Sequence, residues 1–320
     1  MPSSNRLQVL VGNSIVPPSP KHELLVAFRF GPSSDIEDHP SVVDTHLDPI
    51  GHNVLYECWW VANSVSYHTI RGIRIAECAD YSVLIQESIA HTNDGFVGQT
   101  QSAYSDMFSA LQTCTHTQIA KVWNYVGAIN EGDGDEERYR KFSVGRAKAF
   151  SEFALADSDA PAATGIGTRA HRGLTTITRA SSHAQFLLEN PRQISAFQYP
   201  RQYGPISPKF ARGASVVAGD HTLQLLSGTA SIVGHESLHP YDSSLQLDET
   251  LKNIAALCET MPILDGGGIF RVYMRNVDDY ESVRDKLISD FHFDRRQLVF
   301  LCGDICRREL LVELDGVRVT

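Results

Sequence analysis

The sequence contains little that would serve a membrane, a nucleic acid or a disulfide scaffold. Of its 320 residues only 6 are cysteine, and they are scattered, so they are expected to be free thiols. Lysine and arginine number 28 against 38 acidic residues, and no basic run is present to attract nucleic acid or anionic lipid. No apolar run approaches the roughly 18 residues of a membrane span, and no secretory signal pattern is present. We therefore expect a cytoplasmic globular protein with neither nucleic acid nor membrane as a partner.

Metal-binding patterns are also scarce, and the one match fails on its context. Residues 235–239, His-Glu-Ser-Leu-His, match the H-E-x-x-H pattern, which holds zinc only when a helix brings both histidines to one face. Pro240 follows directly and disfavours a helix at this point. The preceding residues 221–234 have the pattern of a strand, a tight Ser-Gly turn and a second strand, so the motif is expected in a loop. Since no third ligand is indicated, we predict no metal site.

The sequence does contain an internal repeat with an offset of 150 residues. Residues 97–111 and 247–261 share the apolar spacing of an amphipathic helix, and alternating, strand-like segments follow from Ile119 and from Ile269. Each copy continues with a second helix and a closing strand. These fall at 138–150 and 174–181 in the first copy, and at 279–291 and 310–316 in the second.

Such a repeat predicts two similar domains, residues 51–190 and 191–320, each with strands and helices in the same order. Residues 1–50 are rich in proline, serine and aspartate. They are expected to form an N-terminal arm of turns and extended segments, without regular elements, over the fold.

A loop rich in arginine, tyrosine and proline is a candidate binding segment. Residues 197–213 contain Tyr199, Arg201, Tyr203 and Arg212 together with three prolines. Guanidinium groups bind carboxylates through paired hydrogen bonds and tyrosine hydroxyls add donors, so the loop suits an anionic ligand. A polar surface loop whose arginines meet acidic neighbours would have the same composition.

The C-terminal segment offers an acid and a thiol. Alternation over 309–314 places Glu313 on the same strand face as Glu309 and Leu311, opposite the face expected to pack in the core. A buried glutamate has a raised pKa and can donate a proton, whereas a solvent-facing one has no such role. Cys306 likewise fits either a small core residue or a reactive thiol.

Six segments in chain order give the sequence its resemblance to a known family. They are NYVGAIN (124–130), RYRKFSVGRAKAF (138–150), PAATGIG (161–167), ISAFQYPRQYGPISPKFARG (194–213), LLSGTASIVGHES (225–237) and CRRELLVELDG (306–316). The chain thereby resembles the chorismatase family of bacterial enzymes, which cleave chorismate to pyruvate and a ring product. The second repeat also resembles a subunit of the Rid (YjgF) superfamily. The two resemblances imply an α+β fold of two tandem Rid-like repeats, each a mixed β-sheet packed by helices on one face.

The resemblance implies specific roles in the site. Glu313 would be the catalytic acid that protonates the methylene carbon of the enolpyruvyl ether, and no metal or organic cofactor would be needed. The implied substrate-binding residues are Arg146, Tyr199, Arg201, Tyr203, Arg212, Gly228 and Ala230. The partner would be chorismate alone. A monomer is expected, because two repeats in one chain bury part of the surface that Rid subunits share in a trimer.

The resemblance also suggests a product. Gly228, before the TASIVG strand, and Cys306, seven residues before Glu313, fit the 3-hydroxybenzoate synthase-like subtype, with Cys306 as a second catalytic residue that contacts the ring. Pyruvate and 3-hydroxybenzoate are then the implied products. Formation of 4-hydroxybenzoate as well, hydrolysis to 3,4-dihydroxycyclohexa-1,5-diene carboxylate, Rid-type imine deamination and noncatalytic anion binding stay open. Because residues seven apart point to opposite faces of a strand, a bulge or strand start is expected between them, near Arg307 and Arg308.

Overall fold

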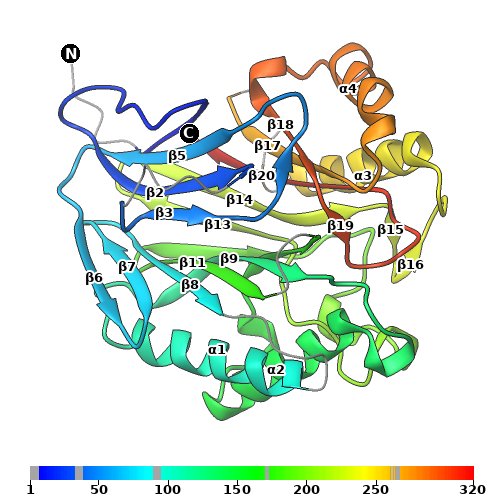
Figure 1. The fold of residues 1–320 in the computed structure, drawn as a ribbon, viewed down its shortest axis with the longest axis horizontal. Helices are drawn as coiled ribbons and strands as arrows, with labels where there is room; N and C mark the ends of the chain where they lie inside the picture. Colours follow the sequence, from blue (N-terminus) through cyan, green and yellow to red (C-terminus); the bar gives the residue numbers. More distant parts are fainter. Residues whose placement is uncertain are drawn as a thin grey trace.

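Two seven-stranded sheets lie one above the other in the computed structural model, with helices on their outer faces and a four-stranded sheet beside them (Figure 1). The structure describes residues 7–32, 39–88, 95–169, 173–259, 261, 263 and 267–320. None of the helices among these residues has the length and apolar character needed to cross a membrane.

The first large sheet has the strand order β19-β10-β9-β11-β8-β7-β6. Its strands are β6 (Ser66–Ile70), β7 (Ile73–Glu77), β8 (Ser82–Ser88), β9 (Gln118–Gly127), β10 (Ala162–Thr168), β11 (Leu174–Ser181) and β19 (Asp304–Ile305). Helix α1 (Phe96–Leu111) connects β8 to β9, and helix α2 (Arg138–Glu152) connects the parallel pair β9 and β10.

The second large sheet repeats this arrangement, in the order β12-β13-β14-β20-β17-β18-β4. Its strands are β4 (Asp48–Pro49), β12 (Ala184–Leu188), β13 (Gly213–Ala218), β14 (His221–Ala230), β17 (Ile269–Met274), β18 (Leu298–Cys302) and β20 (Val312–Val319). Helix α3 (Ser243–Cys258) takes the place of α1, and helix α4 (Tyr280–Ser289) connects the parallel pair β17 and β18. The predicted α+β fold of two tandem repeats, each a mixed sheet with helices on one face, is confirmed.

The strand pairing bears on where the repeats begin and end. β12 starts at Ala184, before the predicted start of the second domain at residue 191, and pairs with β13 in the second sheet. Each large sheet is also completed by a short strand from elsewhere in the chain, β19 on β10 and β4 on β18. The division at residues 50/51 and 190/191 stays a prediction.

The expectation that residues 1–50 lack regular elements was wrong. β1 (Gln8–Gly12), β2 (Glu23–Phe30) and β3 (Val42–Asp44) join β5 (Leu55–Val61) in the four-stranded sheet, in the order β1-β5-β2-β3. β2 is apolar over almost its whole length because both of its faces are buried, and such a run lacks the alternation that marks a half-exposed strand. Residues 1–6 and 33–38 of the predicted arm lie outside the described residues.

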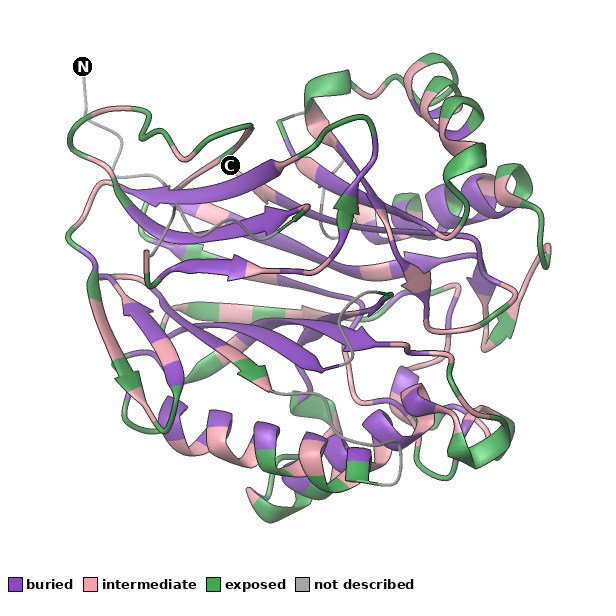
Figure 2. Cartoon of the chain, viewed as in Figure 1, coloured by how far each residue is buried: buried purple, intermediate pink, exposed green. Residues whose placement is uncertain are grey.

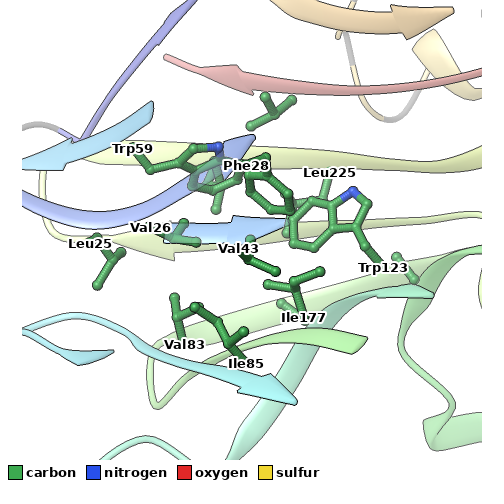
Figure 3. Close-up of a cluster of buried hydrophobic side chains, with 14 of the residues drawn as sticks. Leu25, Val26, Phe28, Val43, Trp59, Val83, Ile85, Trp123, Ile177 and Leu225 are labelled. Carbon is green, nitrogen blue, oxygen red and sulfur yellow. The ribbon is translucent and has the colours of Figure 1, made fainter. Parts of the chain in front are cut away.

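The apolar core has one inner layer and two outer ones. Side chains of all three sheets meet in the inner layer, where Phe28 and Trp59 lie among Trp123, Ile177 and Leu225 (Figure 3). The outer layers lie between α1 and α2 and the first sheet, and between α3 and α4 and the second. Accordingly the sheets are largely buried on both faces, whereas the helices expose their outer sides (Figure 2).

Two local predictions about residues 221–240 have different outcomes. The tight Ser-Gly turn was wrong, because β14 runs through Ser227 and Gly228 as one strand whose pairing with β20 shifts register between Leu226 and Thr229. A bulge therefore replaces the turn. The H-E-x-x-H residues lie in no helix, as predicted, and belong to the small hairpin of β15 (Ile232–Val233) and β16 (Glu236–Ser237) and the segment that follows it.

Candidate active site

A cavity of about 450 Å³ lies between the two repeats. The first repeat supplies side chains from β10 and α2, and the second supplies them from β14, β20 and the loop 193–212. The cavity-lining residues that the sequence predicted are Arg146, Tyr199, Tyr203, Arg212, Gly228, Ala230, Cys306 and Glu313.

Glu313 is buried on β20 and faces this cavity. It is 4% exposed, and its strand neighbours are Ala230 of β14 and Tyr273 of β17. Val312 and Leu314 point to the opposite side, into the core under α3 and α4. The alternation predicted for this strand is thus present, although both of its faces are buried rather than one facing solvent.

The Glu313 carboxyl lies directly against Gly228. A Cβ atom added to Gly228 would stand 2.1 Å from Glu313 Oε1, so the carboxyl would have to move. Gly228 lies within the register shift of β14, two residues before Ala230, the residue that pairs with Glu313. Glycine is therefore required at this position for the carboxyl to occupy its place in the cavity wall.

The environment of Glu313 favours the protonated acid. Burial raises the pKa of its carboxyl to about 8, the negative charge of Asp315 adds to the rise, and Lys121 opposes it. Among the described residues none forms a hydrogen bond with this carboxyl. At neutral pH Glu313 can therefore hold a proton and donate it into the cavity.

Cys306 reaches the same cavity by a change of sheet. It follows β19, which pairs with the first sheet, and the chain then turns at Arg307–Leu310 before β20 starts at Val312 in the second sheet. The expected strand start between Cys306 and Glu313 is confirmed. Burial, followed by the nearby Glu313, raises the pKa of the Cys306 thiol to about 12. Cys306 is therefore a neutral thiol rather than a thiolate at neutral pH.

Arg146 presents unpaired donors to the cavity wall. It is 3% exposed on α2, and its Nε and Nη2 atoms have no hydrogen-bond partner among the described residues. Gly145 lets α2 approach α1 closely, since an added Cβ would stand 2.5 Å from the carbonyl oxygen of Val97. A buried guanidinium with free donors requires an acceptor, and an anion in the cavity would supply one.

A second group of cations and rings lies on the loop between β12 and β13 and includes Arg307 from the turn between β19 and β20. Arg212 Nη2 donates to the Tyr199 hydroxyl at 3.0 Å, and its Nε is buried without a partner among the described residues. The Arg307 guanidinium stacks 3.9 Å above the Tyr203 ring and donates to the His235 carbonyl at 2.9 Å. His235, the first histidine of the H-E-x-x-H segment, thus supports the cavity wall through its backbone carbonyl.

Arg201 is not part of this site. Its side chain is 66% exposed and forms a two-pronged ion pair with Asp135 in the acidic loop after β9. It does not line the cavity. The structure thus pairs Arg201 with Asp135 outside the cavity, and its role in binding a substrate carboxylate stays a prediction.

Several cavity residues were not singled out from the sequence. Among them are Asn124, Tyr139, Thr164 and Arg307. Arg307 carried a usable signal, since it stands beside Cys306 in a turn that precedes the acid. The other three come from the first repeat, and the packing of β10 against β14 brings Thr164 beside Gly228 and Glu313.

No cluster of three His, Cys, Asp or Glu side chains in the described part of the chain is arranged to hold a metal ion. The chemistry available in the cavity is that of a neutral carboxylic acid, a neutral thiol, and guanidinium groups with free donors.

Comparison with known proteins places this geometry in context. Residues 57–179 match a family model described as "Chorismatase FkbO/Hyg5-like, N-terminal". The chain is 33% identical over 274 residues to a 3-hydroxybenzoate synthase of Streptomyces hygroscopicus, covering 81% of this chain and 80% of that protein. It is 31% identical to a chorismatase of Streptomyces rapamycinicus over 278 residues, 82% of this chain and 81% of that one. A chorismatase crystal structure matches with a TM-score of 0.86 and 25% identity over 98% of both chains.

Proposed function

The chain belongs to the chorismatase family, and on this premise we propose that it cleaves the enolpyruvyl ether of chorismate to pyruvate and 3-hydroxybenzoate. The observation that carries the proposal is Glu313, an acid buried in a cavity wall with a pKa of about 8. Protonation of a carbon atom requires an acid that is held close to that carbon and is still protonated at the pH at which the enzyme works.

The first chemical step is proton transfer from Glu313 to the methylene carbon of the enolpyruvyl group. The ether carbon then carries positive charge, which the adjacent oxygen shares, and the bond between that oxygen and the ring becomes the weakest in the substrate. Glu313 is left as a carboxylate close to this developing positive charge, which favours the transition state.

Substrate binding falls to the cations of the cavity wall. Arg146 and Arg212 lie on opposite repeats, and both have buried donors without partners among the described residues. Two such groups suit the two carboxylates of chorismate. Tyr199 and Tyr203 complete the wall beside Arg212 and Arg307.

The second step releases pyruvate and rearranges the ring. Pyruvate and a hydroxybenzoate together have the composition of chorismate itself, whereas the dihydrodiol requires an added water. Breaking the bond at ring C3 leaves the hydroxyl on C4, so 3-hydroxybenzoate requires the C4 oxygen to bond C3 as pyruvate leaves, while its hydroxyl proton passes to the Glu313 carboxylate. Glu313 can then protonate this bridging oxygen as the C4–O bond opens. The carboxylate finally takes up the C3 proton that aromatisation releases, which restores the acid. Cys306, a neutral thiol in the same wall, lies where it can contact the ring and keep water from it.

Product analysis tests the proposal. Purified protein is incubated with chorismate, and the products are separated against standards of 3-hydroxybenzoate, 4-hydroxybenzoate and the dihydrodiol. We expect 3-hydroxybenzoate and pyruvate in equal amounts, and no turnover by a folded Glu313→Gln variant. If the dihydrodiol were the main product, the enzyme would hydrolyse chorismate instead of aromatising its ring. Binding of chorismate without any product, or turnover of an imine instead, would refute the proposed function.

A further inference from the structure

A buried group of charged and polar residues lies beside Glu313, and Thr164 is its member that also lines the cavity. Lys121 of β9 is fully buried, and its Nζ donates to Thr164 Oγ1 and to the Leu226 carbonyl oxygen, both at 2.7 Å. The same Nζ lies 3.9 Å from Asp315 Oδ2. The ammonium group therefore links β9 and β10 of the first repeat to β14 and β20 of the second.

Asp315 is the acceptor at the centre of this group. Its Oδ2 accepts hydrogen bonds from Thr164 Oγ1 at 2.7 Å, from Trp123 Nε1 at 3.0 Å and from the Tyr273 hydroxyl at 3.2 Å. Three donors that converge on one oxygen suit a carboxylate rather than a neutral carboxylic acid. Asp315 stands two residues after Glu313 on β20, so both side chains leave the strand on the same face.

We propose that Asp315 and Lys121 are positioning residues with opposite effects on Glu313: Asp315 helps it to keep its proton, and Lys121 favours loss of that proton. The Asp315 carboxylate retains the proton on Glu313, because a second negative charge beside it would be repelled. The Lys121 ammonium limits this effect by attracting the ionised form of Glu313. The inference rests on the proposed function in that it assigns Glu313 the role of proton donor.

The pKa directions agree with this geometry. The charge of Asp315 raises the pKa of Glu313 and that of Lys121 lowers it. Burial lowers the pKa of Lys121 itself to about 7, against the opposing pull of Asp315. Lys121 and Glu313 thus titrate in neighbouring pH ranges, so each influences the other and the observed transition belongs to the pair.

Three further titratable groups near Glu313 stay uncharged in this range. Tyr139 of α2 and Tyr273 of β17 have pKa values raised well above the usual value, and that of Cys306 is raised to about 12, in each case chiefly by burial. Arg146, Arg212 and Arg307 also line the cavity, together with Glu137 and Glu309. Asp315 and Lys121 are therefore the charges that distinguish this acid from an ordinary glutamate.

The test compares Asp315→Asn and Lys121→Met with the wild-type protein in the pH dependence of kcat/KM for chorismate. The alkaline limb is the fall of kcat/KM as Glu313 loses its proton at high pH. In Asp315→Asn we expect this limb to move to lower pH by about one pH unit or more, which lowers kcat/KM about tenfold at a given pH on the limb. Activity of this variant should recover in more acidic buffer. In Lys121→Met the limb should move to higher pH. Asp44→Asn, which removes the ion pair with Arg29 in the four-stranded sheet, is the control and should leave the limb in place.

A second measurement needs no substrate. NMR of isotope-labelled glutamate carboxyl groups, with the Glu313 signal identified by its absence from Glu313→Gln, reports the titration of this acid directly. The signal should show the same two opposite shifts even if chorismate proves not to be the substrate, so failure of the proposed function is distinguishable from failure of this inference. An unshifted or upward-shifted limb and signal in Asp315→Asn would overturn the role of Asp315. If Asp315→Asn does not fold, the test rests on Lys121→Met alone. An alkaline limb and a Glu313 signal that stay in place or move to lower pH in this variant would overturn the proposal.

Discussion

At the scale of the single residue, the site combines an acid and a neighbour that makes room for it. Glu313 is buried without a hydrogen bond from the described residues, and Gly228 lies where any side chain would collide with its carboxyl. An isolated buried carboxyl is costly when it ionises. Its presence in an otherwise well-packed strand is explained by proton donation rather than by stability.

Replacement of this acid should therefore stabilise the protein in a pH-dependent way. The pKa of Glu313 is raised from 4.5 to about 8, so the folded protein holds an extra proton between these values and loses stability as the pH rises through them. We expect the melting temperature of Glu313→Gln to exceed that of the wild type increasingly from pH 5 to 8, with no further gain above. The free-energy difference is at most about 5 kcal/mol. A difference that stays constant with pH would contradict the raised pKa.

Gly228→Ala tests the space around the acid. The new Cβ would displace the Glu313 carboxyl, because its 2.1 Å approach to Oε1 leaves no room and Thr164 Cγ2 stands 3.4 Å away on another side. We expect a folded protein with kcat/KM for chorismate reduced by about 100-fold, the scale of a misplaced catalytic group. Gly12→Ala is the matched control, because the nearest atom to an added Cβ, the Ser14 carbonyl oxygen, is 3.9 Å away. Unchanged turnover in Gly228→Ala would show that the carboxyl acts from another position.

The sequence led to part of this site for identifiable reasons. Glu313 was indicated by strand alternation and by resemblance, and Gly228 and Cys306 by resemblance alone. Arg201 lies outside the cavity, which composition could not reveal because its partner Asp135 is far along the chain. Thr164 was missed because it reaches the acid only through the stacking of β10 against β14, which is a tertiary contact.

At the scale of elements, the helices were the easiest to predict and β14 the hardest. The apolar spacing of 3.6 residues located α1 and α3 because each buries one face only. β14 was read as a hairpin since Ser-Gly is common in turns, yet here the pair forms a bulge that serves the acid. The local sequence does not distinguish these two uses of glycine.

Two helical glycines allow a matched test of how α1 and α2 pack. Gly98 of α1 is exposed with no atom within 4 Å of an added Cβ, so Gly98→Ala should stabilise the protein by up to about 1 kcal/mol through helix propensity. Gly145→Ala in α2 should instead destabilise it, because the Cβ would collide with the Val97 carbonyl and push the helices apart. Urea unfolding measures both. Stabilisation by both variants would mean that the helices do not depend on this close approach.

At the scale of the whole molecule, one buried ion pair joins all three sheets. Arg271 of β17 forms two hydrogen bonds with Glu57 of β5, at 2.7 and 2.8 Å, and a third with the Tyr125 hydroxyl of β9 at 3.1 Å. The Arg271 guanidinium also lies 4.0 Å from the Phe28 ring centre in β2. The N-terminal strands are therefore part of the same core that holds the acid, which their proline-rich flanks did not indicate.

This pair should make the three sheets depend on each other. Glu57→Gln leaves Arg271 as a buried cation without its counter-charge, and Arg271→Met leaves Glu57 as a buried carboxylate without its cation. Each single variant should therefore lower the free energy of unfolding by about 3–5 kcal/mol. The double variant should cost no more than the worse single one, because neither charge is then left unpaired. Calorimetry over the full set of four proteins gives this cycle. Asp106→Asn, which removes an exposed pair with Arg71, should cost less than about 1 kcal/mol and serves as the control. Additive losses in the double variant would show that the two charges act independently, and that the sheets are joined by apolar contacts alone.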